Sequence, residues 1–435
     1  MGLQAGATAT SADDGPPGWR RVVFLTACTM ALCNIDRVLL SVAGLPMAAE
    51  FAFNSPTMGV LQSSYLWGYG LGQVPSGLLS DRFGGPRVLL GGLALWSLAT
   101  LALPLARSSA APLAVLTLTR VLFGFGSAVA LPAVSATVSR LVPESRRASN
   151  LAAIYAAFNL GSLAGMGSTP PLIAAAGWPA CFVLYGMLGL VWTVVATAAL
   201  PGYVRAGKDA PGGAASCAPE VSGGSFALRR GGAAQLAALV WVHSVIGWGF
   251  FVMLSWIPTY LVQSLSFTDL RMVGVVSALP WLVCAVVGVM AGALADWLGT
   301  ARGWDAFRVR SAMNRVATLG PAASLLLLPF ATGPITAVMC LCAAMGAQSF
   351  NYAGFHNLVQ DKAGGRAGTL LAISNTGGII MGIIGNISTG WLVAKTGSFS
   401  SIFFLTAALY LSSFAVWTLV IRSGPVFEEV ACADD

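Results

Sequence analysis

Charged residues are scarce in this chain of 435 residues: Asp, Glu, Lys and Arg together make up 9% of it, whereas 56% is hydrophobic. A water-soluble globular protein carries about 25% charged residues. Water therefore cannot be the only solvent of this chain. Because apolar runs recur from residue 22 to residue 421, we expect the whole chain to lie in a lipid bilayer.

The patterns that mark soluble catalytic sites are also missing. The chain has only two histidines, His243 and His356, and no glycine-rich phosphate loop followed by Lys and Ser or Thr. Its eight cysteines show no metal-ligand or redox spacing, so we expect them to be small apolar fillers. These absences argue against an ATP-driven pump and against a membrane enzyme, and they predict a protein without a metal or a cofactor.

Long apolar stretches are what the chain does have. A helix that spans a bilayer needs about 20 mostly apolar residues. The stretches that meet this need are 22–46, 56–80, 87–106, 112–140, 149–173, 178–200, 235–262, 271–295, 310–330, 334–358, 367–394 and 399–421. The sequence thus predicts an all-α membrane protein with twelve transmembrane helices and both termini on one side.

Basic residues test this topology, because Lys and Arg concentrate on cytoplasmic loops. With the termini inside, 18 of the 23 Lys and Arg residues fall on the inside and three fall outside. The remaining two, Arg37 and Arg120, lie well within predicted spans. We therefore expect a multi-pass protein with cytoplasmic termini, and the net charge of +7 reflects orientation and not nucleic-acid binding.

Internal repetition divides the chain into two pseudo-symmetric halves. The pattern G-x-L-x-D-x-x-G follows the second span at Gly77–Gly84 and the eighth span at Gly292–Gly299. Between the halves, Ala206–Ser225 is rich in Gly, Ala, Pro and Ser, which is typical of a flexible linker. The predicted division is a tail over 1–21, a six-helix bundle over 22–200, a linker over 201–233, a six-helix bundle over 234–421 and a tail over 422–435.

Arg37 and Arg120 are the least expected residues of the apolar spans, because a lone arginine at the bilayer centre costs about 2.5–3.5 kcal/mol on insertion scales. A guanidinium matches carboxylate and phosphate oxygens bidentately, which favours an anion site. The other interpretation is a structural ion pair. Asp36 cannot directly satisfy Arg37, since neighbours on a helix point about 100° apart, but it can reach Arg120 from another helix.

Further polar and aromatic side chains within the spans are candidates to line the same site. Tyr65 and Tyr69 share one helix face because they are four residues apart, and Tyr155 and Asn159 have the same spacing. Hydrogen bonding between helices is the alternative role of each. The candidate anion-binding residues are Arg37, Arg120, Tyr65, Tyr69, Tyr155, Asn159, Trp248 and Asn375.

The loop Gly77–Arg87, with the sequence GLLSDRFGGPR, resembles the signature loop of the major facilitator superfamily. Its glycines permit a tight turn and close helix approach. Asp81, Arg82 and Arg87 predict a latch of ion pairs across the cytoplasmic face that breaks as the halves rock. Asp296 occupies the matching place in the second half.

Further segments are similar to one branch of that superfamily, the anion:cation symporters, and most of all to its plant plastid phosphate and ascorbate transporters. They lie in both halves and in the same order: Cys33–Val38, Gln62–Tyr69, Arg120–Gly126, Trp256–Tyr260, Leu279–Trp281 and Ser374–Gly378. The resemblance implies a secondary transporter that carries phosphate, ascorbate or another carboxylate by alternating access. It also implies a monomer in a membrane, with stromal termini if that membrane is the plastid inner envelope.

The coupling of this transport stays open. Ser127 occupies the position of a glutamate that is tied to proton coupling in the family. Asp36 and His243 are the remaining protonatable candidates, since a histidine titrates near neutral pH. Sodium coupling and uncoupled transport are the alternatives. A cation or drug exporter of the same fold and a non-transporting receptor are the competing functions, although an exporter of cations is expected to place acids inside its spans.

Overall fold

The computed structural model describes residues 18–143, 146–200, 226–229, 231–362 and 367–429. The first half of the chain forms α1 (Trp19–Glu50), α2 (Ser55–Phe83), α3 (Gly85–Ala102), the 3-10 turn η1 (Leu103–Ser108), α4 (Pro112–Ser127), α5 (Ala130–Leu141) and α6 (Arg147–Ala199). The second half forms β1 (Phe226–Leu228), α8 (Gly232–Gln263), α9 (Leu270–Thr300), α10 (Ala306–Leu327), η3 (Leu328–Phe330), α11 (Pro334–Gln348), η4 (Ser349–Asn351), the π-helical η5 (Tyr352–His356), α12 (Asn357–Lys362), α13 (Ala367–Thr396), α14 (Ser400–Val420) and β2 (Phe427–Glu429).

Helical structure covers all twelve predicted spans. In the part of the chain that the structure describes, eight helical stretches are long and apolar enough to cross a membrane. One of them, Ala153–Ala199, contains two predicted spans, because α6 turns sharply at Gly177, where φ is +78° and only glycine is free of strain. The predicted spans outside these eight lie in α2, which carries several polar residues, in α10, which carries Arg308, Arg310 and Arg315 in its first half, and in α11, which has only 15 residues.

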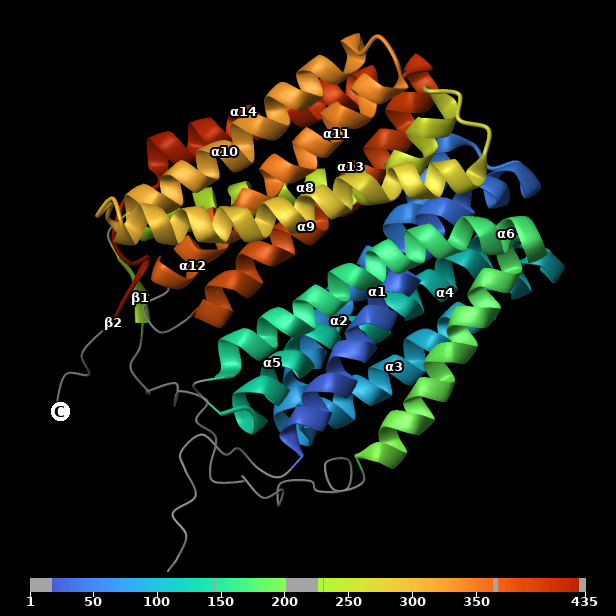
Figure 1. Cartoon of the computed structure of the whole chain (residues 1–435), viewed down its shortest axis with the longest axis horizontal. Coiled ribbons are helices and arrows are strands. Elements are labelled where there is room, and N and C mark those ends of the chain that lie inside the picture. The colour runs from blue at the N-terminus through green and yellow to red at the C-terminus, as the bar shows by residue number, and fades with distance from the viewer. Residues whose placement is uncertain (1–17, 144–145, 201–225, 230, 363–366, 430–435) are drawn as a thin grey trace, which may run out of the picture.

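Figure 1 shows two helical bundles, α1–α6 in blue to green and α8–α14 in yellow to red, which approach each other at the upper right and diverge toward the lower left. We call the lower left, where α1 and α8 begin, the terminal end. One apolar cluster crosses the boundary between the bundles away from that end. It joins Leu61 and Trp178 of the first bundle to Trp256 and Phe399 of the second.

The two bundles contact each other along α2 and α13, but only over part of the length of these helices. Gly59 lies against the backbone of Asn386, and Gly70 lies against Ile379. The same face of α2 continues one turn later with Val74, which is 74% exposed. The described bundles therefore pack against each other at the end opposite the termini and separate toward the terminal end, and we call the space between the helices there the opening.

A short sheet and one buried lysine organise the terminal end of the second bundle. β1 pairs antiparallel with β2. The Lys362 ammonium is buried and donates to Gln235 Oε1 at 2.7 Å, to the carbonyl of Gly424 at 2.9 Å and to the carbonyl of Arg422. These bonds fasten the segment after α14 to the bundle. Residues 1–17 of the predicted tail and most of the predicted linker lie outside the described residues, so the domain boundaries stay predictions.

Candidate functional site

Arg37 lies inside the first bundle within a cage of aromatic rings. Its guanidinium carbon stands 5.8 Å from the ring centre of Tyr65, 5.4 Å from that of Tyr69 and 5.2 Å from that of Phe158. Cation–π contacts of this kind stabilise a charge without neutralising it. The Arg37 Nε has no hydrogen-bond partner among the described residues, and its side chain is only partly buried. Arg37 therefore keeps donor capacity for a ligand.

Arg120 is the more deeply buried of the two arginines, with 3% of its surface exposed. Its guanidinium carbon lies 4.7 Å from the ring centre of Phe123 and 5.5 Å from that of Tyr65. Nη1 makes one long contact, at 3.5 Å, with the backbone carbonyl of Asp36, and Nε has no partner in the described part of the chain. The Tyr65 ring is thus shared by both guanidiniums.

Asp36 is the carboxylate of this site. It is 2% exposed, acts electrostatically on Arg120 and leaves its Oδ1 without a hydrogen-bond partner among the described residues. No ion pair within 4.0 Å joins it to either arginine in that part of the chain. With all three groups ionised, the interior of this bundle carries a net charge of +1. An uncompensated charge in a low-dielectric interior favours a ligand of opposite sign.

Two helix contacts set this geometry. A Cβ atom on Gly124 would lie 2.8 Å from the backbone nitrogen of Tyr69, so only glycine lets α4 approach α2 and bring Arg120 to the Tyr65 ring. Asn34 Nδ2 donates to the Phe158 carbonyl at 2.7 Å and to Ser162 Oγ at 2.5 Å, which fixes α6 against α1. Sequence reasoning missed Phe158 and Asn34, although Asn34 belongs to the same short segment as Arg37.

The opening between the bundles is lined by tyrosines from both halves. Tyr155 of α6 is 39% exposed and lies near Tyr69, and Asn159 on the same helix is also exposed. Tyr352 of η5 is 53% exposed, and it lies near Tyr155 although the two belong to different bundles. Of the predicted site residues, Arg37, Tyr65 and Tyr69 therefore cluster, and Tyr155 extends the cluster toward the second bundle.

The structure does not bring every predicted residue to this cluster. Trp248 is buried inside the second bundle and donates from Nε1 to Thr406 Oγ1 at 2.9 Å, so it joins α8 to α14. Asn375 is half-buried on α13, next to Ser374, whose hydroxyl contacts Nδ1 of His243 at 3.0 Å. His243 and Asn375 therefore belong to a second polar region, away from the two arginines.

The predicted latch is described only in part. The Asp81 side chain lies outside the described residues, while Arg82, which lies over the ring of Phe83, and Asp296 are exposed near the terminal end. The two ion pairs among the described residues join Arg107 to Glu50 at 2.6 Å and Arg310 to Asp361 at 3.2 Å, each within one half. Neither of these two pairs connects the halves.

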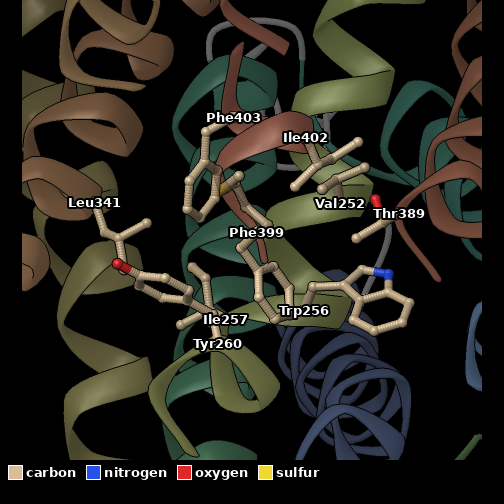
Figure 2. A pocket seen from close by; sticks show the side chains of 10 residues that line it. Val252, Trp256, Ile257, Tyr260, Leu341, Thr389, Phe399, Ile402 and Phe403 are labelled. Atoms are coloured by element: carbon tan, nitrogen blue, oxygen red, sulfur yellow. The ribbon is translucent and has the colours of Figure 1, made fainter. Parts of the chain in front are cut away.

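One cavity in the second bundle is apolar and small. Figure 2 shows Trp256, Tyr260, Phe399 and Phe403 around it, together with aliphatic side chains and Thr389. Its volume of ≈ 10 Å³ is about what one water molecule needs, so it is no cargo site. Among the described residues there is also no group of three or more His, Cys, Asp or Glu side chains that could hold a metal ion.

Comparison with known proteins shows to which family the chain belongs. Residues 23–386 match the family model described as Major Facilitator Superfamily. The ascorbate transporter of Arabidopsis thaliana chloroplasts is 35% identical, over 93% of this chain and 76% of the relative. The sodium-dependent phosphate transport protein 1 of Arabidopsis thaliana chloroplasts is 35% identical, over 94% of this chain and 80% of the relative.

A solved structure has the same fold. A bacterial homologue of the human lysosomal transporter Spinster, in an inward-facing and unoccupied conformation, superposes with a TM-score of 0.73 at 15% identity. The superposition covers 94% of this chain and 98% of that protein, which confirms the predicted fold class. The chain therefore belongs to the major facilitator superfamily, as a multi-pass secondary transporter and not an enzyme, and is related to plant plastid anion transporters.

Proposed function

We propose that this transporter carries a small organic or inorganic anion, such as phosphate, ascorbate or another carboxylate, by alternating access. The observation that supports it most is the net positive charge of the first bundle, which holds two arginines, Arg37 and Arg120, and one carboxylate, Asp36, that acts on Arg120. Because a buried charge without a partner is costly, its presence is explained by a cargo of opposite sign. A cation exporter offers no such explanation.

The cage around Arg37 suggests how the anion is held. Tyr65, Tyr69 and Phe158 stack on the guanidinium and orient it, and the unpartnered Nε leaves donors for a carboxylate or phosphate oxygen. Tyr65 Oη is buried without a partner in the described part of the chain and can donate to the same anion. The relatives named for ascorbate and for phosphate support both cargo classes.

The open end of the bundles then defines the direction in which cargo leaves or enters. With the terminal end on the cytoplasmic or stromal side, as the basic residues predict, this structure is open inward. The halves would rock about the contact of α2 and α13, and Asp81, Arg82, Arg87 and Asp296 would approach one another when the terminal end closes. A cysteine introduced at Thr300, at the terminal end of α9, should react with an impermeant thiol reagent only from the inside. Reaction from the outside would contradict this orientation.

The function is tested by uptake of radiolabelled phosphate and ascorbate into liposomes that contain the purified full-length protein. The Arg37→Gln variant should lose uptake of the transported anion. The matched control is Arg302→Gln. Arg302 is exposed in the loop between α9 and α10, and its guanidinium carbon lies 5.0 Å from the ring centre of Trp297. Normal uptake by a well-folded Arg37→Gln protein would refute the anion site.

A further inference from the structure

The only two histidines of the chain meet inside the second bundle. The ring centres of His243 on α8 and His356 on η5 lie 5.4 Å apart, and the planes are perpendicular at 88°. Phe355 packs against His243 at 4.9 Å, and Tyr352 stacks on His356 at 5.5 Å with an interplanar angle of 19°. Tyr352 is 53% exposed, so His356 lies one ring behind an exposed surface.

A neutral His243 keeps one nitrogen that can bind a proton. The Ser374 hydroxyl lies 3.1 Å from the carbonyl oxygen of Leu371 and 3.0 Å from Nδ1 of His243, and which of the two groups donates in the second contact depends on the tautomer of the ring. In either tautomer a neutral imidazole carries one proton and keeps one lone pair, which can accept a second proton.

No carboxylate faces this pair in the described part of the chain, and His356 is the only titratable group there that acts electrostatically on His243. The charged residues on the packed elements are Lys395 on α13, Arg308, Arg310 and Arg315 on α10, Arg271 and Asp296 on α9, and Asp361 and Lys362 on α12. Most of them lie toward helix ends, but Arg315 lies midway along α10, next to Asn314, which packs against Gly354 of η5. Asp361 is already paired with Arg310. The uncharged titratable neighbour of the pair is Tyr352, which stacks on His356. Cys284 of α9 lies near Tyr352, and Tyr410 of α14 lies near Cys284.

An imidazolium at this place has no protein counter-charge, so an empty transporter keeps the pair neutral. An anion in the opening supplies that charge. Tyr155 lies near Tyr69 of the cage and near Tyr352 of the second bundle, so these tyrosines lead from the cage of Arg37 toward the histidine pair. An anion that reaches Tyr352 lies one ring away from His356.

We propose that the His243–His356 pair is a proton site that fills together with the anion, so that the transporter moves one proton with each anion. This rests on the proposed anion transport. A proton from water on one side adds to an imidazole lone pair when the anion is bound, and it is released with the anion on the other side. By linkage, proton and anion strengthen each other's binding by the same factor.

The test uses the full-length protein labelled with ¹⁵N-histidine and purified without a histidine tag, so that only His243 and His356 contribute nitrogen signals. At pH 6, in nanodiscs without anion, both imidazoles should be neutral, and saturating ascorbate or phosphate should convert one to imidazolium. Bound anion with two neutral rings overturns the proton site but leaves anion transport standing. If neither anion binds, the proposed function fails and this inference fails with it.

Transport provides an independent measurement. For ascorbate, a monovalent anion, a gradient of one pH unit should drive about tenfold accumulation in liposomes. His356→Gln should remove this accumulation while exchange of ascorbate across the membrane persists. Accumulation that persists in His356→Gln but is lost in Asp36→Asn, or that follows a sodium gradient and not a proton gradient, refutes the assignment to the histidines.

Discussion

Replacing Arg37 or Arg120 by glutamine should separate binding from folding, because only one of these arginines faces a carboxylate. Arg37→Gln removes the cation that has no counter-charge among the described residues. Arg120→Gln removes the cation that acts on Asp36 and leaves that carboxylate buried alone. Both variants should lose transport, and only Arg120→Gln should lose stability.

The magnitudes follow from the contacts. A hydrogen bond to a charged group contributes about 1.5–3 kcal/mol, and each 1.4 kcal/mol is a factor of ten. Losing one such bond from Arg37 to the anion should therefore lower transport efficiency about 10- to 100-fold. Arg37→Lys keeps the charge but loses stacking on three rings, which contributes about 0.5–2 kcal/mol, so it should lie between wild type and Arg37→Gln.

For folding, breaking a buried charge pair costs about 3–5 kcal/mol. Because no ion pair within 4.0 Å joins Asp36 to Arg120 among the described residues, we expect Arg120→Gln to lie at or below the lower end of this range. Its Tm in detergent should fall, and Asp36→Asn added to it should restore part of the loss, since the lone carboxylate is then gone. Arg37→Gln should unfold at or above the wild-type Tm.

The assay combines initial uptake rates in liposomes with thermal unfolding of the same preparations. Arg302→Gln serves as the control in both, because it removes an exposed charge far from the site. Equal loss of Tm in Arg37→Gln and Arg120→Gln would show that both arginines are structural. That result, or full uptake by Arg37→Gln, would refute the argument from charge balance.

Three further changes have defined outcomes. Tyr65→Phe removes a buried hydroxyl that has no partner among the described residues, so Tm should stay unchanged. The apparent affinity for the anion should fall about 2- to 10-fold, and an unchanged affinity would exclude a hydrogen bond from Tyr65 to the cargo. Gly124→Ala should lower Tm because the added Cβ would meet the α2 backbone. Gly91→Ala is the control and should not lower Tm in this way, because a Cβ there meets nothing within 4 Å. Equal changes of Tm in the two variants would contradict the close crossing of α2 and α4. Burial lowers the pKa of Lys362, which lies beyond the predicted span 334–358, to about 8. Between pH 8 and about 10.4 this lysine is therefore protonated more fully in the unfolded chain than in the folded protein. The stability of the wild type should consequently rise with pH over this range relative to that of Lys362→Met. Parallel pH profiles of Tm for the two proteins would contradict this.

Much of the site was predictable, because charge inside an apolar span is visible without coordinates. The cost of charge in lipid points to Arg37, Arg120 and Asp36, and helical spacing points to Tyr65 and Tyr69. Tyr65 and Tyr69 surround Arg37, Arg120 shares the Tyr65 ring, and Asp36 acts on Arg120. Trp248 had the same polar character but serves the contact of α8 with α14. Phe158 was missed because a phenylalanine in an apolar span carries no signal of its own.

The sequence by itself determined the number and order of the helices. The reason is that the thickness of the bilayer sets the length of a span, and the two sides of the bilayer set the distribution of basic residues. Only the tertiary structure decided which side chains meet: His243 with His356, Tyr155 with Tyr352, and a contact of α2 with α13 that ends near Gly70. The reason is that a helix in lipid is apolar on nearly every face. Its rotation and register against neighbours are therefore set by close packing at small residues and by a few hydrogen bonds, and not by a hydrophobic pattern along the chain.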